Sequence, residues 1–564
     1  MKKFLLLLFV FAGTASFALD RNAFTFTNYD LTLRLEPGQF RLGVRGKITL
    51  RNDSAVPQKT LALQISSSLA WRSIQANGQS LDFVSQRYTS DIDHTGSLSE
   101  AIVTLQKDVP AKGTLELEIG YEGIIPIDAT RLVRMGAPKD LASHSDWDQI
   151  GSKATAVRGV GYVAWYPVAI EAANLSEGNS VFDALRSWKL RSASSSMHIS
   201  LCAYSNHDDN LLAAFMNDVP GKGSTNGECS DHVFSPIGLT VPMFAAGKYS
   251  VAKGESGETR FFSDRPAAEI YQTASDRVVP FVTEWFGAPK RKVLVVELND
   301  PKAAPFESGT MLLTPLNFNA NTAESTAVHQ LTHAALPSSR PWIYEGLAHF
   351  AQALYAEKRN GREAALELMN ASRQQVIDRE KAIAEELDAN AASEQSLINT
   401  SSEEFVRSKA MYVWWMLRDM LGDPAIKGAI ASYKADQDRE PSYVQHLFAA
   451  QSKRDLEWFF DDWVYRDRGL PDFRIVSVYP RQTLQNTYLL TITVENLGEA
   501  GAEVPVMAPY QGIETTERLQ VKGKSQNSVR LQMATVPDEA TVNDGSVPET
   551  DFTNDTVKVQ TPTK

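Results

Sequence analysis

The sequence predicts a multidomain α+β protein, with β-rich segments towards both ends and a largely helical segment between them. Residues 28–253 alternate apolar and polar side chains in short runs, as in "YDLTLRLEPGQFRLGVRGKITLRN", which is typical of strands. From residue 267 to about residue 468, most segments repeat apolar side chains at helical spacing. The alternating pattern returns from about residue 471. A chain of 564 residues is also too long for one hydrophobic core.

These changes of pattern divide the chain into four predicted segments. Residues 1–18 form a signal peptide, and residues 19–255 form an all-β N-terminal domain. Residues 256–470 form a mixed domain with a helical part, and residues 471–564 form a C-terminal β-sandwich. Turn residues support the β assignments, notably Pro37-Gly38 and the stretch from Pro110 to Gly113.

The N-terminus, "MKKFLLLLFVFAGTASFALD", has the pattern of a secretory signal. Two lysines precede an apolar run, and Ser16-Phe17-Ala18 is a small-x-small cleavage site. The apolar run is too short to span a bilayer, and no later segment approaches about 18 uninterrupted apolar residues. We therefore expect an exported protein without a membrane span, in the periplasm or the extracellular medium.

Charge and cysteine content narrow the classes of partner. A net charge of −12 disfavours nucleic acid and anionic membrane surfaces. The two cysteines, Cys202 and Cys229, are compatible with one disulfide in an oxidising compartment or with two separate thiols. The sequence contains no indication of the oligomeric state.

The stretch "VHQLTHAALPSSRPWIYEGLAHF" carries the most informative pattern. His329 and His333 are four residues apart on a predicted helix, so both imidazoles project from one face, as two zinc ligands must. We expect Asn321 or Thr322 to cap this helix, Glu324 to occupy a capping-box position and Pro337 to end it. The alternative is an ordinary polar helix face.

Glu345 follows at the start of a second predicted helix, which begins near Pro341. A short turn between the two helices can return this carboxylate to the histidine pair. Two histidines and one glutamate with an open fourth position form a catalytic type of zinc site. The alternative is that Glu345 lies on the solvated face of an amphipathic helix, together with His349 and Gln352.

"PWIYEGLAHF" resembles the Trp-Leu-x-Glu-Gly-x-Ala segment of the aminopeptidase N family of gluzincin zinc metallopeptidases. The preceding motif is divergent, with His-Gln-x-x-His in place of His-Glu-x-x-His. Segments such as "VVPFVTEWFGAPKRKVLVVE" and "SKAMYVWWMLRDMLGD" extend the resemblance over about residues 28–473. The resemblance implies an N-terminal saddle domain and a thermolysin-like gluzincin domain with a helical extension.

The resemblance also implies roles for individual residues. His329, His333 and Glu345 would be the ligands of one zinc ion. Glu307, in "PFESGTM", would correspond to the glutamate that holds the free amine of the substrate. The alternative for Glu307 is an ordinary loop carboxylate.

Three departures from the family pattern fall on the reactive groups. Gln330 stands at the general base, Arg407 at the transition-state tyrosine and Gln352 at an outer-shell glutamate. A neutral amide cannot accept the proton of an attacking water, and loss of a general base costs roughly 10²- to 10⁴-fold in rate.

The resulting hypothesis is an exported pseudopeptidase, silent or very slow, that retains zinc and binds peptide or protein N-termini. Two alternatives stay open. The first is an active exported zinc aminopeptidase with atypical acid/base residues. The second is a metal-free structural or interaction protein whose β domains make the contacts.

Overall fold

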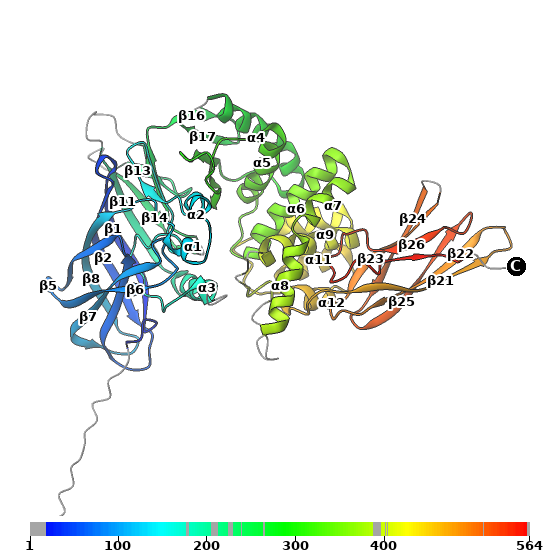
Figure 1. Ribbon diagram of the computed structural model, residues 1–564, viewed down its shortest axis with the longest axis horizontal. Helices are drawn as coiled ribbons and strands as arrows, with labels where there is room; N and C mark the ends of the chain where they lie inside the picture. The colour runs from blue at the N-terminus through cyan, green and yellow to red at the C-terminus, as the bar shows by residue number, and fades with distance from the viewer. Residues whose placement is uncertain are drawn as a thin grey trace, which may run out of the picture. The chain divides into compact units, whose positions relative to one another are not determined.

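The structure is a computed structural model that describes residues 19–175, 180–204, 213–223, 229–238, 240–262, 265–386, 396–400, 402, 404–510 and 513–560. The chain is a mixed α+β protein that divides into two compact units, Met1–Gly247 and Lys248–Lys564 (Figure 1). The signal peptide expected at residues 1–18 lies outside the described residues. Within the described residues, no helix is long and apolar enough to cross a membrane.

The first unit is built from three sheets. An eight-stranded sheet has the order β13-β14-β11-β1-β2-β8-β4-β5, a three-stranded sheet β3-β7-β6 and a four-stranded sheet β12-β15-β10-β9. The strands are β1 Phe24–Glu36, β2 Arg41–Asn52, β3 Gln58–Ser66, β4 Leu69–Ala76, β5 Gln79–Ser80, β6 Asp82–Thr89, β7 Ser97–Val109, β8 Thr114–Ile124, β9 Gln149–Ile150, β10 Ala154–Val157, β11 Ser196–Ala203, β12 Ala213–Met216, β13 Lys222–Gly223, β14 Cys229–Phe234 and β15 Phe244–Gly247.

A disulfide joins two neighbouring strands of the large sheet. Cys202 on β11 lies opposite Cys229 on β14, and the two residues are bonded to each other. The bond closes a loop of chain across an antiparallel strand pair, and closure of this kind restricts the unfolded chain.

The prediction of an all-β N-terminal domain needs correction, because the first unit also contains helices. These are α1 Thr130–Arg134, α2 Lys139–Ser145 and α3 Ser180–Ser192. The sequence signal for α3 is the apolar spacing of Val181, Leu185 and Trp188, which follows helical periodicity. Val181 and Trp188 are buried in the core of this unit.

The second unit begins with a five-stranded sheet of order β16-β17-β18-β20-β19. Its strands are β16 Ser250–Lys253, β17 Gly257–Phe261, β18 Val293–Glu297, β19 Phe306–Ser308 and β20 Met311–Thr314. Sequence analysis placed Ser250–Lys253 in the N-terminal domain, but β16 pairs with β17 in this sheet. Because strand pairing is a tertiary contact, the alternating pattern alone did not reveal which sheet the strand joins.

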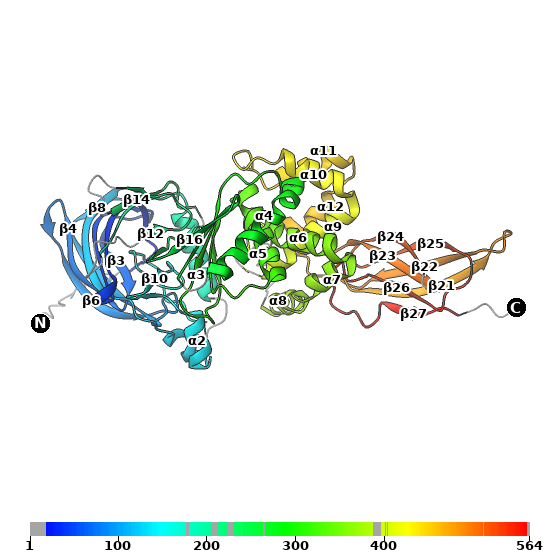
Figure 2. The same ribbon diagram turned by 90° about the horizontal axis from the view of Figure 1, so that it is seen from above.

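The helices of this unit lie between and after these strands, and α4 and α5 pack against the sheet (Figure 2). They are α4 Arg265–Phe286, α5 Ala320–Ala335, α6 Pro341–Asn360, α7 Arg362–Asn370, α8 Arg373–Glu386, α9 Ala410–Leu421, α10 Asp423–Ser432, α11 Tyr443–Ser452 and α12 Glu457–Phe460, with π-helical turns η4 Phe405–Lys409 and η5 Asp461–Tyr465. Helix α5 packs against both α4 and α6, and α6 packs against α9 and η4.

The C-terminal part forms two sheets, of order β21-β22-β25 and β24-β23-β26-β27, that pack against each other. The strands are β21 Phe473–Gln482, β22 Tyr488–Asn496, β23 Ala502–Tyr510, β24 Ile513–Val521, β25 Ser525–Met533, β26 Glu539–Val542 and β27 Thr556–Lys558. One continuous apolar core runs from the helices into these sheets. Trp463 contributes to this junction by donating its indole N–H to the carbonyl of Gly501 at 2.7 Å.

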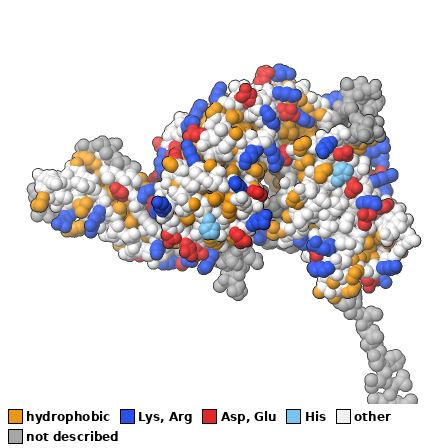
Figure 3. Space-filling model, turned by 180° about the vertical axis from the view of Figure 1, so that it is seen from behind, with side chains coloured by type: hydrophobic (Ala, Val, Ile, Leu, Met, Phe, Trp, Pro, Cys, Tyr) orange, Lys and Arg blue, Asp and Glu red, His pale blue; other side chains and the backbone are white. Residues whose placement is uncertain are grey.

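Charged side chains of both signs share the surface. On the face shown in Figure 3, lysine and arginine side chains lie among aspartate and glutamate side chains. Against this background, the buried ionisable groups of the second unit stand out. Two of them, Glu549 and Asp555, lie together in the C-terminal part at 0% and 4% exposure.

Glu549 accepts hydrogen bonds from the backbone N–H of Phe473, at 2.8 Å, and from the amide of Asn543. Burial and the neighbouring charge of Asp555 raise the pKa of Glu549 to about 9. An unfolded glutamate has a pKa of about 4.3. The folded protein therefore holds a proton that the unfolded chain releases, and this contribution to stability is lost as pH rises through the folded pKa.

We expect the free energy of unfolding, measured by urea denaturation followed by tryptophan fluorescence, to fall as pH rises from 5 to 9, by up to about 1.4 kcal/mol per pH unit for one proton. Glu549→Gln cannot ionise, so its free energy of unfolding should vary less with pH. Glu539→Gln, at an exposed position on β26, is the matched control. Equal pH slopes in the parent and Glu549→Gln would contradict this assignment.

Candidate metal centre

Helix α5 carries the histidine pair, and its start differs from the predicted one. The N-cap is Asn319, whose side chain accepts hydrogen bonds from the backbone N–H groups of Asn321 and Thr322. Thr322 completes the capping box by accepting from the N–H of Asn319. The expected cap at Asn321 or Thr322 was therefore wrong by two or three residues, because several polar residues precede this helix.

Glu324 is correspondingly not part of the capping box. It is 2% exposed and contacts the hydroxyl of Tyr355 at 2.8 Å and the guanidinium of Arg277 at 2.6 Å. Arg359 lies 3.3 Å from Oε2 of Glu324, the oxygen that also accepts from Tyr355. Three partners hold this carboxylate between α4, α5 and α6.

His329 and His333 lie one helical turn apart on α5 and are 6% and 3% exposed. Their Nε2 atoms are 3.1 Å apart. Tyr344 of α6 stacks on His333, with 3.7 Å between ring centroids and 13° between planes. Its hydroxyl donates to the carbonyl of Gly309 at 3.0 Å. Tyr344 thus joins α5, α6 and the β19–β20 turn.

Glu345 projects from the first turns of α6. The helix begins at Pro341, whose fixed φ suits a first helical position. The following residue, Gly346, allows α6 to approach α9 closely, because a Cβ there would lie 2.7 Å from Cβ of Ala410. The close packing of α6 against α9 therefore sets the position of Glu345 relative to α5.

Glu307 lies on β19, the edge strand of the five-stranded sheet. It is opposite Leu312 of β20, and β20 leads through a short loop into α5. The resemblance implies that Glu307 holds the free amine of a substrate, with an ordinary loop carboxylate as the alternative. The structure places it beside the two imidazoles, with its Oε1 3.1 Å from Nε2 of His329.

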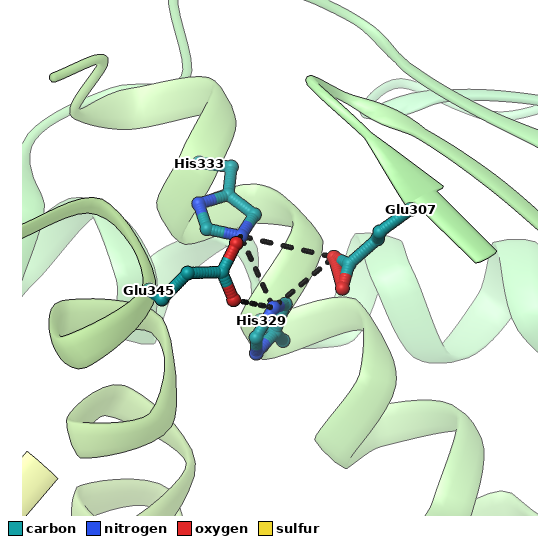
Figure 4. A group of neighbouring side chains, drawn as sticks. All are labelled: Glu307, His329, His333 and Glu345. Atoms are coloured by element: carbon teal, nitrogen blue, oxygen red, sulfur yellow. Dashed lines mark hydrogen bonds and ion pairs between the residues drawn. The ribbon is translucent and has the colours of Figure 1, made fainter. Parts of the chain in front are cut away.

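The four side chains converge on one space (Figure 4). From Nε2 of His333, Oε1 of Glu307 is 3.7 Å away and Oε1 of Glu345 is 3.8 Å away. Oε2 of Glu345 is 3.9 Å from Nε2 of His329. One donor atom from each of the four residues lies within 4.8 Å of all the others.

These separations suit a metal ion. Tetrahedral zinc ligands at about 2.0–2.1 Å from the ion lie about 3.3 Å from one another. Imidazole nitrogen and carboxylate oxygen are both zinc donors. His329, His333, Glu345 and Glu307 therefore form a donor set of the right chemistry and spacing to hold zinc.

The electrostatics of the group reflect its burial. Burial opposes ionisation of Glu307, but the nearby imidazoles, chiefly His329, lower its pKa to about 2. Burial works against protonation of His329, yet the charge and hydrogen bond of Glu307 raise its pKa. Burial and the charge of His329 push the pKa of His333 well below its usual value. His333 is therefore neutral, the form that binds metal.

Of the three residues at which the sequence departs from the aminopeptidase N pattern, Gln330 and Arg407 contact the donor set, whereas Gln352 joins two helices. The Gln330 amide nitrogen donates a hydrogen bond to Oε1 of Glu307. Nε of Arg407, on the turn η4, lies 3.4 Å from Oε2 of Glu345. Gln352 donates to the carbonyl of Ser325 at 3.1 Å and so links α6 to α5.

Sequence reasoning missed two contributors. Tyr344 precedes Glu345 directly, and its stacking on His333 depends on how α6 crosses α5. His349 places its ring 4.8 Å from that of His329. Burial, with the charge of His329, lowers the pKa of His349 to about 3. His349 lies four residues after Glu345 on α6, so the two side chains share a helix face, and this spacing could have indicated His349.

No protein-family model matches the chain, and no curated protein matches it. Among solved structures, the chain is similar to an M1 zinc metallopeptidase from Deinococcus radiodurans, crystallised as a point mutant. The two are 15% identical with a TM-score of 0.44, and the alignment covers 81% of this chain and 97% of that one.

We expect Gly346→Ala to destabilise the second unit by about 1–3 kcal/mol, because overpacked cores shift backbone and rotamers. The new Cβ would meet Ala410 at 2.7 Å and Trp414 at 3.1 Å, and both residues are buried. Since α6 must move, Glu345 should also lose its alignment, which a metal titration would register as weaker binding. Lys358→Ala, exposed on the same helix, is the control. A variant with unchanged stability and metal affinity would contradict the proposed packing.

Proposed function

We propose that this protein is a metal-holding, hydrolytically silent pseudopeptidase of the aminopeptidase-like type. The observation that supports the proposal is the convergence of His329, His333 and Glu345 at zinc-ligand spacing, beside an amide at position 330. When bound, zinc would supply a Lewis acid at this site. The protein groups around it are suited to holding the ion and poorly suited to moving protons.

Position 330 is the first reason for silence. An amide has no basic lone pair that can accept a proton, and the nitrogen of Gln330 already donates to Glu307. Glu324, the glutamate of α5, is engaged by Tyr355 and Arg277. Loss of the general base corresponds to roughly 10²- to 10⁴-fold in rate.

Position 407 is the second reason. A tyrosine there would offer a hydroxyl donor to a developing oxyanion, and loss of such a donor costs about 10²- to 10³-fold. Arg407 instead directs Nε towards the carboxylate of Glu345 at 3.4 Å. The positive charge of the Arg407 guanidinium therefore faces Glu345, one of the residues proposed to bind the metal.

Binding of a peptide or protein N-terminus would require Glu307 to accept the partner's amine. In this structure Glu307 already accepts from Gln330 and lies beside His329. An incoming amine would have to replace those contacts. The geometry therefore supports metal binding more directly than binding of a peptide N-terminus.

We expect the mature chain, purified without added metal or chelator, to contain about one zinc per chain by elemental analysis. His329→Ala should lose it, whereas His446→Ala, at an exposed position on α11, should retain it. Zinc-free protein that takes up no zinc on incubation would contradict the proposal and favour a metal-free interaction protein.

We further expect no chelator-sensitive cleavage of aminoacyl-amide substrates by the parent chain, and a rise above this baseline in Gln330→Glu/Arg407→Tyr. The double change returns a proton acceptor and a hydroxyl donor, which together correspond to roughly 10⁴-fold or more. Gln352→Glu alone returns neither group and is the control. Strong chelator-sensitive turnover by the parent would establish an active peptidase instead, with Glu307 as the nearest available base.

A further inference from the structure

We propose that Glu307 is a fourth metal ligand and that Gln330 holds it in that position, so that four protein groups enclose the ion. The proposal rests on the metal-holding function above and goes beyond it. It gives the metal a structural role, joining β19, α5 and α6, and it leaves no coordination position for a substrate.

The distances favour Glu307 at least as strongly as Glu345. The carboxylate of Glu307 approaches Nε2 of His329 to 3.1 Å, whereas that of Glu345 is 3.9 Å away. Their distances to Nε2 of His333 are 3.7 and 3.8 Å. Figure 4 shows the two carboxylates reaching the imidazole pair from different elements. The four donors lie close enough together to share one ion, and four protein ligands is the number in closed structural zinc sites.

Gln330 makes this placement of Glu307 favourable. Each carboxylate oxygen has two lone-pair directions, so Oε1 can accept from the Gln330 amide and still face the ion. A glutamate at position 330 would offer no donor and would add a second negative charge next to Glu307. The amide oxygen of Gln330 is buried and has no hydrogen-bond partner within the described residues, so its nitrogen is its means of attachment.

The strand that carries Glu307 is itself held in place. Tyr344 stacks on His333 and donates its hydroxyl to the carbonyl of Gly309, two residues after Glu307. The β19–β20 turn is thereby tied to the helix that carries Glu345. Partners that orient metal ligands in this way commonly contribute 10–100-fold to metal affinity.

The charges of the site also favour Glu307. Without it, the carboxylate of Glu345 alone would face both the divalent cation and the guanidinium of Arg407, whereas Glu307 adds a second negative charge. His329 and His333 are almost fully buried, so an uncompensated charge beside them would be costly.

The experiment uses the full mature chain with Co²⁺ in place of zinc, because the visible absorption of Co²⁺ reports its coordination. We expect the parent spectrum to be unchanged by azide and by pH between 6 and 9, since no position is open. Glu307→Gln should respond to azide, and its metal affinity, measured against a competing chelator, should fall by at least about 10–100-fold. Glu258→Gln, on β17 of the same sheet, should match the parent.

Gln330→Glu and Gln330→Met test the hydrogen bond from Gln330 to Glu307 separately from Glu307 itself. Both should retain Co²⁺ and become azide-responsive, because neither can donate a hydrogen bond to Glu307. Gln330→Met adds no charge. If both variants respond to azide, the response is therefore due to the lost hydrogen-bond donor and not to the added charge of Gln330→Glu. A parent spectrum that shifts with azide would overturn the four-ligand assignment while leaving metal holding intact. A parent chain that binds neither Co²⁺ nor zinc would overturn both proposals.

Discussion

The second unit is organised around one costly arrangement, in which two imidazoles and two carboxylates meet in a largely buried space. Groups of this kind are stable away from water only when their charges and hydrogen bonds are satisfied. The pair of carboxylates needs positive charge, and the imidazoles need an acceptor or a metal for their inward-facing nitrogens. A divalent cation would meet both needs at once.

The surrounding architecture keeps the donors at ligand spacing. The reciprocal cap at Asn319 defines where α5 begins, and Gly346 allows α6 to approach α9. Lys409, at the end of the turn η4, is 1% exposed and contacts Glu380 at 2.5 Å and Asp467 at 2.8 Å. This buried ion pair network anchors the turn that presents Arg407 to Glu345. Packing, capping and buried charge all therefore contribute to the geometry of the site.

One side chain decides what kind of chemistry such a site supports. At position 330, a carboxylate would take protons and repel Glu307. An amide of nearly the same shape donates to Glu307 and draws it towards the imidazoles. Glutamine in place of glutamate at position 330 thus removes a proton acceptor and supplies a hydrogen-bond donor to Glu307. If the site holds a metal as proposed, the absence of a base at position 330 and the enclosure of the ion would have a single physical cause.

Several local features of the structure, namely which residues share a helix face and where some helices and strands begin, could be predicted from the amino-acid sequence. Residues four apart on a helix share a face, which related His329 to His333, and Pro341 marked where the next helix begins. Strand alternation similarly located the strands of the C-terminal part. The position of Glu307 could not be read in this way, because it depends on the pairing of β19 with β20 and on the path from that sheet to α5. The stacking of Tyr344, the membership of β16 in the second sheet and the hydrogen bond from Gln330 to Glu307 are likewise long-range contacts. Periodicity records which way a side chain points from its own element, whereas the partner that it meets is chosen only when the elements pack.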